Sequence, residues 1–289
     1  MAKTITNMGA SVRARLLTIA RQRKQTFDLI LTRYAIERFL YRLSISPYQD
    51  RFVLKGAMLM TTWFDVPFRP TRDLDLLGYG NPETQGILRI FAEVCEIDTN
   101  DGVVFDSKSL AVDRIREEME YGGLRIRLNA DIGGATVRVS IDIGFGDATD
   151  PGLEELDYPI LLDDPSPHLR AYSRETVIAE KFQAMVMLGR ANSRMKDFYD
   201  IWMLARTHTF DGERLARAVA ATFKRRNTDI PIEAPDALTT GFAEDQGKQQ
   251  QWEAFVRGVE AEAPPLADTI AELAEFLMPI AAIARERSA

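Results

Sequence analysis

The stretch Thr71-Arg72-Asp73-Leu74-Asp75-Leu76-Leu77 alternates polar and apolar residues, as a half-buried β-strand does. Because residues i and i+2 of a strand point to the same face, Asp73 and Asp75 project together while Leu74 and Leu76 face the core. Two adjacent carboxylates resist joint ionisation unless a cation lies between them. The stretch therefore predicts a strand that presents a divalent-metal site.

Taken alone, the pair is equally consistent with a polar edge face or with ion pairs to Arg69 and Arg72. A two-metal site also draws on a carboxylate from another strand, and Asp142 in the alternating segment 137–143 fits that position. Asp131 and Asp147 lie nearby in the sequence and are alternatives to Asp142.

A second motif, Lys55-Gly56-Ala57, separates the apolar run 52–54 from a helix-like segment at 57–63. A turn of small residues that opens a helix presents backbone N–H groups and a positive dipole end to a phosphate. Lys55 adds a point charge at the same place. The turn and the carboxylates together favour phosphoryl chemistry more than either does alone.

Hydrophobic periodicity places these motifs in an α+β chain with a mixed sheet and a helical C-terminal half. We expect helix over 11–43 and 83–94, a hairpin turning at Gly133-Gly134, and a connector over 150–170. We expect a loop over 229–247 and a kink or break at Pro279. The expected C-terminal helices are 176–188, 196–205, 212–223, 249–259 and 266–284. The domains predicted are 1–48 (N-terminal helices), 49–165 (core) and 166–289 (helical).

The amino-acid composition limits the kinds of metal site that the chain can form. One cysteine and two histidines in 289 residues exclude a disulfide framework and a multi-cysteine zinc site, so metal binding rests on carboxylates, which favour Mg²⁺ or Mn²⁺. The sequence has no signal-like N-terminus and no membrane-length apolar run, so we expect a cytoplasmic protein with no membrane partner. Basic clusters at 13–24 and 224–226 can contact phosphate backbones or form ordinary solvated helix faces.

A third charged region lies in the C-terminal half, where Lys181 lies beside an apolar helix stripe and the segment 190–200 carries several ion-pairing groups. One interpretation is a helix start with Ser193 as N-cap and Asp197 and Asp200 on one face. The other makes Lys181 a phosphate contact and Asp197 a base or an orienting group.

The ordered motifs resemble the AbiEii/AbiGii toxin family, to which the MenT toxins are related, over residues 50–206. The motifs are Lys55-Gly56-Ala57, Arg72-Asp73-Leu74-Asp75, Ile141-Asp142-Ile143, Glu180-Lys181-Phe182 and Arg194-Met195-Lys196-Asp197-Phe198-Tyr199-Asp200. The resemblance implies a polymerase β-type nucleotidyltransferase core followed by a helical C-terminal domain. It also implies a nucleoside triphosphate (NTP) substrate, a divalent metal and, in the MenT branch, a tRNA acceptor.

The resemblance assigns roles by position. Asp73, Asp75, Lys181 and Asp197 match catalytic residues, and Asp73 and Asp75, with Asp142, match metal ligands. The nucleotide-binding set comprises Lys55, Gly56, Ala57, Arg72 and Lys181. Gly56-Ala57 departs from the Gly-Gly or Gly-Ser common in the family, which removes a hydroxyl contact to phosphate.

We therefore expect an Mg²⁺- or Mn²⁺-dependent nucleotidyltransferase that moves a nucleoside monophosphate from an NTP to tRNA or another RNA. Its context would be a toxin–antitoxin or abortive-infection system with a cognate antitoxin. Two alternatives stay open: transfer to a small molecule or a protein, and a non-catalytic nucleotide-binding protein.

Overall fold

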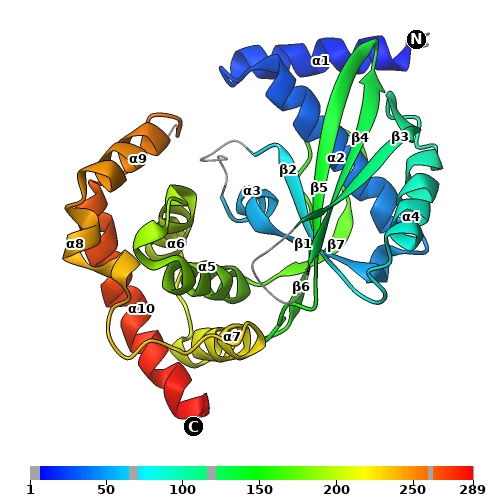
Figure 1. The fold of residues 1–289 in the computed structure, drawn as a ribbon. Coiled ribbons are helices and arrows are strands. Elements are labelled where there is room, and N and C mark those ends of the chain that lie inside the picture. The colour runs from blue at the N-terminus through cyan, green and yellow to red at the C-terminus, as the bar shows by residue number, and fades with distance from the viewer. Residues whose placement is uncertain (1–6, 65–70, 116–121, 260–262, 289) are drawn as a thin grey trace. The chain divides into compact units, whose positions relative to one another are not determined.

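The computed structural model describes residues 7–64, 71–115, 122–259 and 263–288 (Figure 1). The chain forms two compact units. The first unit comprises Met1–Gly146 and Glu154–Ala171, and the second comprises Asp147–Leu153 and Tyr172–Ala289. The division into three stretches expected from the sequence stays a prediction.

The described residues of the first unit are organised around a mixed sheet of seven strands in the order β3-β4-β5-β2-β1-β7-β6. Strand β2 runs parallel to β5 and antiparallel to β1, which confirms the expected α+β class with a mixed sheet. The strands are β1 Phe52–Lys55, β2 Asp73–Gly78, β3 Val103–Ile115, β4 Gly123–Ile132, β5 Ala135–Phe145, β6 Leu153–Asp157 and β7 His168–Tyr172.

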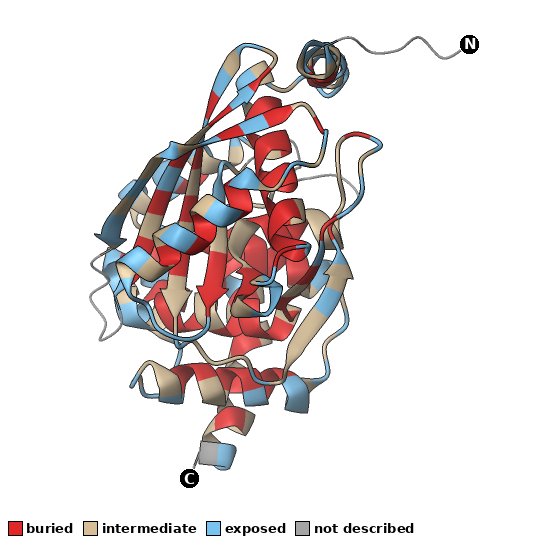
Figure 2. Cartoon of the chain, turned by 90° about the vertical axis from the view of Figure 1, so that its right-hand side faces the viewer, coloured by how far each residue is buried: buried red, intermediate tan, exposed pale blue. Residues whose placement is uncertain are grey.

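Alternation along the central strands gives the sheet one apolar and one polar face. Leu74, Leu76, Ile141 and Ile143 are at most 1% exposed, whereas Asp73, Asp75, Ser140 and Asp142 alternate with them. Figure 2 shows the alternation as buried and exposed bands along the strands. The apolar face packs on α2 and α4, where Phe39, Phe52 and Phe91 form a ring cluster. The opposite face carries the charged residues.

The helices of the first unit are the 3-10 turns η1 Gln49–Arg51 and η2 Gly56–Leu59 and the α-helices α1 Met8–Gln22, α2 Phe27–Ser44, α3 Met60–Trp63 and α4 Thr84–Glu96. The helical segment expected over 11–43 is two helices. Lys24 has a φ of 53° and breaks the segment without Pro or Gly. The expected helix after Gly56 is a 3-10 turn and a single α-helical turn.

The second unit is built from helices, as expected. They are α5 Arg174–Leu188, η3 Gly189–Ala191, α6 Met195–Thr207, α7 Gly212–Arg225, η4 Asp236–Leu238, α8 Thr240–Ala243, α9 Gln246–Val256 and α10 Leu266–Ser288. Aromatic contacts join them, such as Phe182 on α5 with Phe223 on α7, whose ring centroids are 5.4 Å apart.

Two expectations about connections were wrong. The connector over 150–170 contains β6 and the start of β7, and the loop over 229–247 contains η4, α8 and the start of α9. Helix α10 continues through Pro279, so the helix is not broken there, and a kink at this proline stays a prediction. Among the described residues, no helix combines the length and apolarity needed to cross a membrane.

Buried charge fixes α2 to the segment before β3. The Asp101 carboxylate, 3% exposed, accepts hydrogen bonds from Arg38 Nε at 2.9 Å and from Arg42 Nη1 at 2.7 Å. Breaking a buried ion pair leaves an uncompensated charge in the interior, so separating α2 from the segment before β3 would be energetically costly.

Candidate active site

Five charged residues stand opposite one another across five adjacent strands of the first unit, on the polar face of the sheet. Strand register pairs each member with the next: Lys55 with Asp75, Asp75 with Asp142, Asp142 with Arg125, and Arg125 with Asp113. We call this set the charged row. Neighbouring strands lie about 4.8 Å apart, so the Asp75 and Asp142 carboxylates come from adjacent positions.

Asp75 lies directly against the turn after β1. Gly56 has a φ of 73°, and a Cβ added there would come within 2.0 Å of Asp75 Oδ2. Glycine is therefore required at position 56 both for its backbone conformation and for the space it leaves to the carboxylate. The phosphate-binding role of this turn stays a prediction, and the observed packing shows that Gly56 leaves room for the Asp75 carboxylate. The short η2 and α3 that follow give little helix dipole to add to the Lys55 charge.

Asp142 is held by a residue that the sequence analysis did not select. Arg125 donates from Nε to Asp142 Oδ1 and from Nη2 to Oδ2, both at 2.7 Å, in a bidentate pair. The hydrogen bonds that Arg125 donates to Asp142, with further attraction to Asp142, Asp73 and Asp75, raise the pKa of Arg125, so the guanidinium stays charged. Arg125 therefore interacts electrostatically with all three aspartates.

Asp73 stands two residues before Asp75 on the same face and is exposed. It pairs in register with Ser140, which pairs in turn with Arg127. Neighbouring Arg72 forms an exposed ion pair with Asp28 on the first turn of α2. Arg69, the other cation considered for the aspartates, lies outside the described residues.

The donor set suits a hard divalent cation, because it offers carboxylate oxygens and no sulfur or imidazole. Within the described ranges, however, no group of three His, Cys, Asp or Glu side chains is arranged to hold a metal ion. At Asp142 both carboxylate oxygens accept hydrogen bonds from Arg125. By their chemistry the carboxylates of Asp73, Asp75 and Asp142 suit such a cation, whose binding at Asp142 would require Arg125 to release one of its oxygens.

The two alternatives to Asp142 have other partners. Asp131 pairs in register with Thr136 near the hairpin turn, six residues along β4 from Arg125 and about 20 Å away by strand rise. Asp147 belongs to the second unit, where it accepts from Arg226 at 3.4 Å and from the Tyr172 hydroxyl at 3.3 Å. Of the three candidates, Asp142 alone is in register with Asp75.

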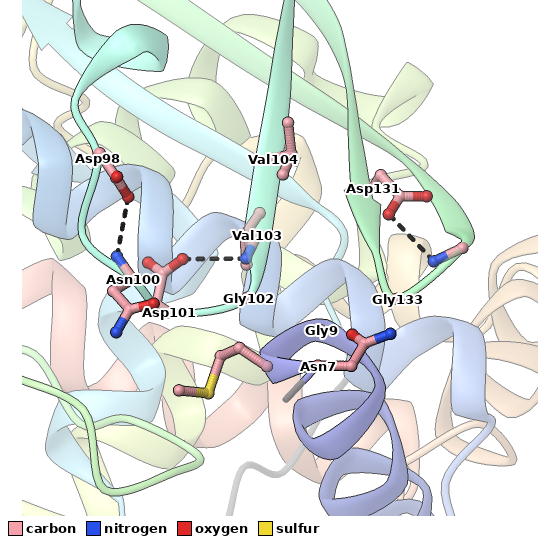
Figure 3. A pocket seen from close by; sticks show the side chains of 12 residues that line it. Asn7, Gly9, Asp98, Asn100, Asp101, Gly102, Val103, Val104, Asp131 and Gly133 are labelled. Atoms are coloured by element: carbon pink, nitrogen blue, oxygen red, sulfur yellow. Dashed lines mark hydrogen bonds between the residues drawn. The ribbon is translucent and has the colours of Figure 1, made fainter. Parts of the chain in front are cut away.

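A cavity of about 430 Å³ lies elsewhere in the first unit, between the start of α1, the loop before β3 and the β4–β5 turn (Figure 3). The carboxylates that line it accept hydrogen bonds from backbone N–H groups of their own loops. Asp98 accepts from the Asn100 N–H at 3.1 Å, Asp101 from Val103 at 3.0 Å and Asp131 from Gly134 at 3.0 Å. Of the carboxylates considered for the metal site, Asp131 lines this cavity, and Asp73, Asp75 and Asp142 do not.

The second unit contains a separate charged group, which we call the lysine cluster: Lys181, Arg194, Asp197 and Asp200. Lys181 Nζ lies 2.6 Å from Asp197 Oδ1 and 2.8 Å from Asp200 Oδ2. Arg194 Nε lies 2.7 Å from the second oxygen of Asp197. Both carboxylates are at most 1% exposed, and the two cations balance them within this group.

Two details of the second unit correct the sequence interpretation. Ser193 is not the N-cap of α6, because Arg194 takes that position without a side-chain cap bond. The basic cluster 224–226 loses one cation to the interior, since Arg226 pairs with Glu180 at 3.1 Å and with Asp147 at 3.4 Å. Attraction to these carboxylates raises the pKa of Arg226 against the opposing effect of its burial, which is the largest single influence.

Comparison with known proteins gives one family match. The sequence profile described as "Nucleotidyl transferase AbiEii toxin, Type IV TA system" matches residues 38–277. Among solved structures, the Helicobacter pylori protein JHP933 has a TM-score of 0.45 at 15% identity, over 87% of this chain and 90% of that one. A candidate nucleotidyltransferase from H. pylori has a TM-score of 0.44 at 14% identity, over 86% and 91%. No curated protein matches the chain.

Proposed function

The chain belongs to the AbiEii family of nucleotidyltransferase toxins of type IV toxin–antitoxin systems, and on this premise we propose that it transfers a nucleoside monophosphate from an NTP to an RNA acceptor. The observation that supports this most directly is the placement of Asp73, Asp75 and Asp142 on one polar sheet face, with Asp75 and Asp142 in register. Family membership gives the reaction class, whereas the acceptor and the metal are our proposal.

In this proposal Asp73 and Asp75 hold Mg²⁺ or Mn²⁺, with Asp142 as the third ligand. When bound, such ions offset the charge of the triphosphate and of the attacking acceptor oxygen. Lys55, in register with Asp75, adds positive charge where the triphosphate would lie. Gly56 leaves room for the Asp75 carboxylate, and Ala57 and the turn supply backbone N–H groups. The exposed Arg72 can leave Asp28 for a phosphate at small cost.

We include Lys181 and Asp197 in the catalytic set, as the resemblance implies. The lysine cluster supports a positioning role for Asp197, because its two oxygens face Lys181 and Arg194. Lys181 keeps 12% of its side chain exposed, and both aspartates hold its ammonium in place.

An RNA acceptor is favoured by α1 and the turn that follows it. This segment has five exposed cations and no acidic residue: Arg13, Arg15, Arg21, Arg23 and Lys24. Arg72 contacts Asp28, which is at most about 14 Å from Lys24 by chain length. One end of the basic segment is therefore linked to Asp73 through Asp28 and Arg72, and from Arg13 to the end of α1 the segment is about 15 Å long. That length suits a phosphate backbone better than a small acceptor.

The type IV toxin–antitoxin description also supports a cognate antitoxin. We place both proteins in the cytoplasm, where NTPs and RNA are available. This location continues the expectation from sequence.

The test is a labelling screen with purified full-length protein, Mg²⁺ or Mn²⁺ and each of the four α-labelled NTPs. Total RNA, a protein extract and a set of aminoglycosides are offered as acceptors. The proposal predicts label on RNA with at least one nucleotide. Label confined to protein or to small molecules would show that the acceptor is not RNA. No label with any nucleotide, while the nucleotide still binds, would favour the non-catalytic alternative.

A further inference from the structure

Arg125 occupies an unusual position for a residue whose partner is a candidate metal ligand. It stands on β4 directly beside Asp142, one strand further from Asp75, and its side chain is 42% exposed. Asp142 is 21% exposed. The pair is therefore not fixed by burial, and Arg125 can reach other anions on the same face without unfolding of the strand.

The Arg125 guanidinium can bind other anions besides the Asp142 carboxylate. Its planar fork binds a carboxylate and a phosphate with the same two parallel hydrogen bonds. Asp142, for its part, can have its charge neutralised by Arg125 or by a divalent cation. Both exchanges occur on one sheet face, so the two partners of Asp142 compete.

We propose that Arg125 is a triphosphate-binding residue that is paired with Asp142 until Asp142 ligates a divalent cation, and then pairs with the phosphates of the nucleotide. This inference rests on the proposed function, since it requires the Asp73–Asp75 site to bind metal and nucleotide. It adds a residue to the nucleotide-binding set and couples metal binding to triphosphate binding.

Arg127 provides a matched control two residues along the same strand. Its side chain is 45% exposed and pairs with Asp113 at 2.6 Å, and in register it faces Ser140 instead of a carboxylate. Arg125→Gln and Arg127→Gln remove the same charge from the same face, so a general electrostatic effect would change both variants equally.

The experiment uses the full-length chain and two probes that need no turnover. Mn²⁺ binding is followed by electron paramagnetic resonance, and tripolyphosphate binding in the presence of Mn²⁺ by calorimetry. Arg125→Gln should bind Mn²⁺ alone more tightly, because Asp142 is released. It should bind tripolyphosphate roughly 10-fold more weakly or worse, the usual loss for a charged hydrogen-bonding partner. Arg127→Gln should change either affinity by less than about fivefold.

Three results would overturn the inference: weaker Mn²⁺ binding by Arg125→Gln, no change in that variant, or equal shifts in both variants. Arg125→Lys, which keeps the charge but loses the fork, should fold like the wild type and still bind tripolyphosphate more weakly. Wild-type protein that binds no Mn²⁺, or binds it equally well after Asp73→Asn, would remove the proposed function and this inference together. Failure confined to the arginine variants removes the inference alone.

Discussion

The charged row of the first unit and the lysine cluster of the second contain similar residues in opposite environments. In the row, the Arg125 side chain is 42% exposed and Asp142 21%, whereas Lys181 is 12% exposed and Asp197 and Asp200 at most 1%. Exposed ion pairs exchange partners at little cost, and buried pairs do not. The row is therefore suited to binding a charged ligand, and the cluster to holding its own members in place.

The lysine cluster offers the largest expected effect. Lys181→Met leaves two buried carboxylates facing each other, and losing one partner of a buried pair costs about 3–5 kcal/mol. Urea denaturation should show a decrease of that size in the free energy of unfolding of the second unit. Arg194→Met, which removes a cation whose side chain is 50% exposed, should cost less than about 1 kcal/mol. Equal small losses for the two variants would mean that the cluster is not structural.

The close approach of Gly56 to Asp75 gives the next effect. Gly56→Ala places a methyl group within 2.0 Å of the carboxylate and must displace it. A displacement near 1 Å can reduce turnover roughly 100-fold. Gly134→Ala is the control: its φ is also positive, at 82°, but its Cβ would meet nothing within 4 Å. Both variants should lose about 1–2 kcal/mol of stability from backbone strain, and only Gly56→Ala should lose transfer rate.

The smallest expected effect comes from Glu37, a buried carboxylate that belongs to neither the charged row nor the lysine cluster. Glu37 on α2 is fully buried, and burial raises its pKa to about 6 despite its pair with Arg33. Because the folded state holds this proton more tightly than the unfolded chain, stability falls as pH rises from about 4.5 through 6, by about 2 kcal/mol in total. Glu37→Gln should abolish that contribution. Unfolding measured at pH 4.5 and 7 should show the difference between wild type and variant changing by this amount, and a constant difference would contradict the assignment.

Local rules were sufficient for much of the fold and for part of the site. Alternation predicted β2 and β5, and the Gly133-Gly134 turn predicted β4 as the hairpin partner of β5. The Arg125–Asp142 pair was also within reach of the sequence. Counting outward from a two-residue turn by equal numbers of residues on each strand leads from Gly133 to Arg125 and from Gly134 to Asp142.

Other features depend on contacts that no local pattern specifies. The parallel register of Asp75 with Asp142 joins strands far apart in the chain, and the pairing of Lys181 with Asp197 joins two helices. The helix break at Lys24 could not be predicted, because no proline or glycine marks it in the sequence. Strands β6 and β7 are short and lie in a segment rich in Pro and Asp, so their composition indicated a connector.

The central claim is that the Asp73–Asp75 face of the sheet carries out nucleotidyl transfer. The most direct test is the initial rate of label transfer to RNA by wild type, Asp73→Asn and Asp113→Asn, with each variant's thermal midpoint as a folding control. Asp113 lies on the same face and is exposed, so its substitution matches the change in charge. We predict a loss of more than about 100-fold for Asp73→Asn, since residues that only support metal ligands already cost roughly 10–100-fold, and little change for Asp113→Asn. Undiminished transfer by folded Asp73→Asn would contradict the account.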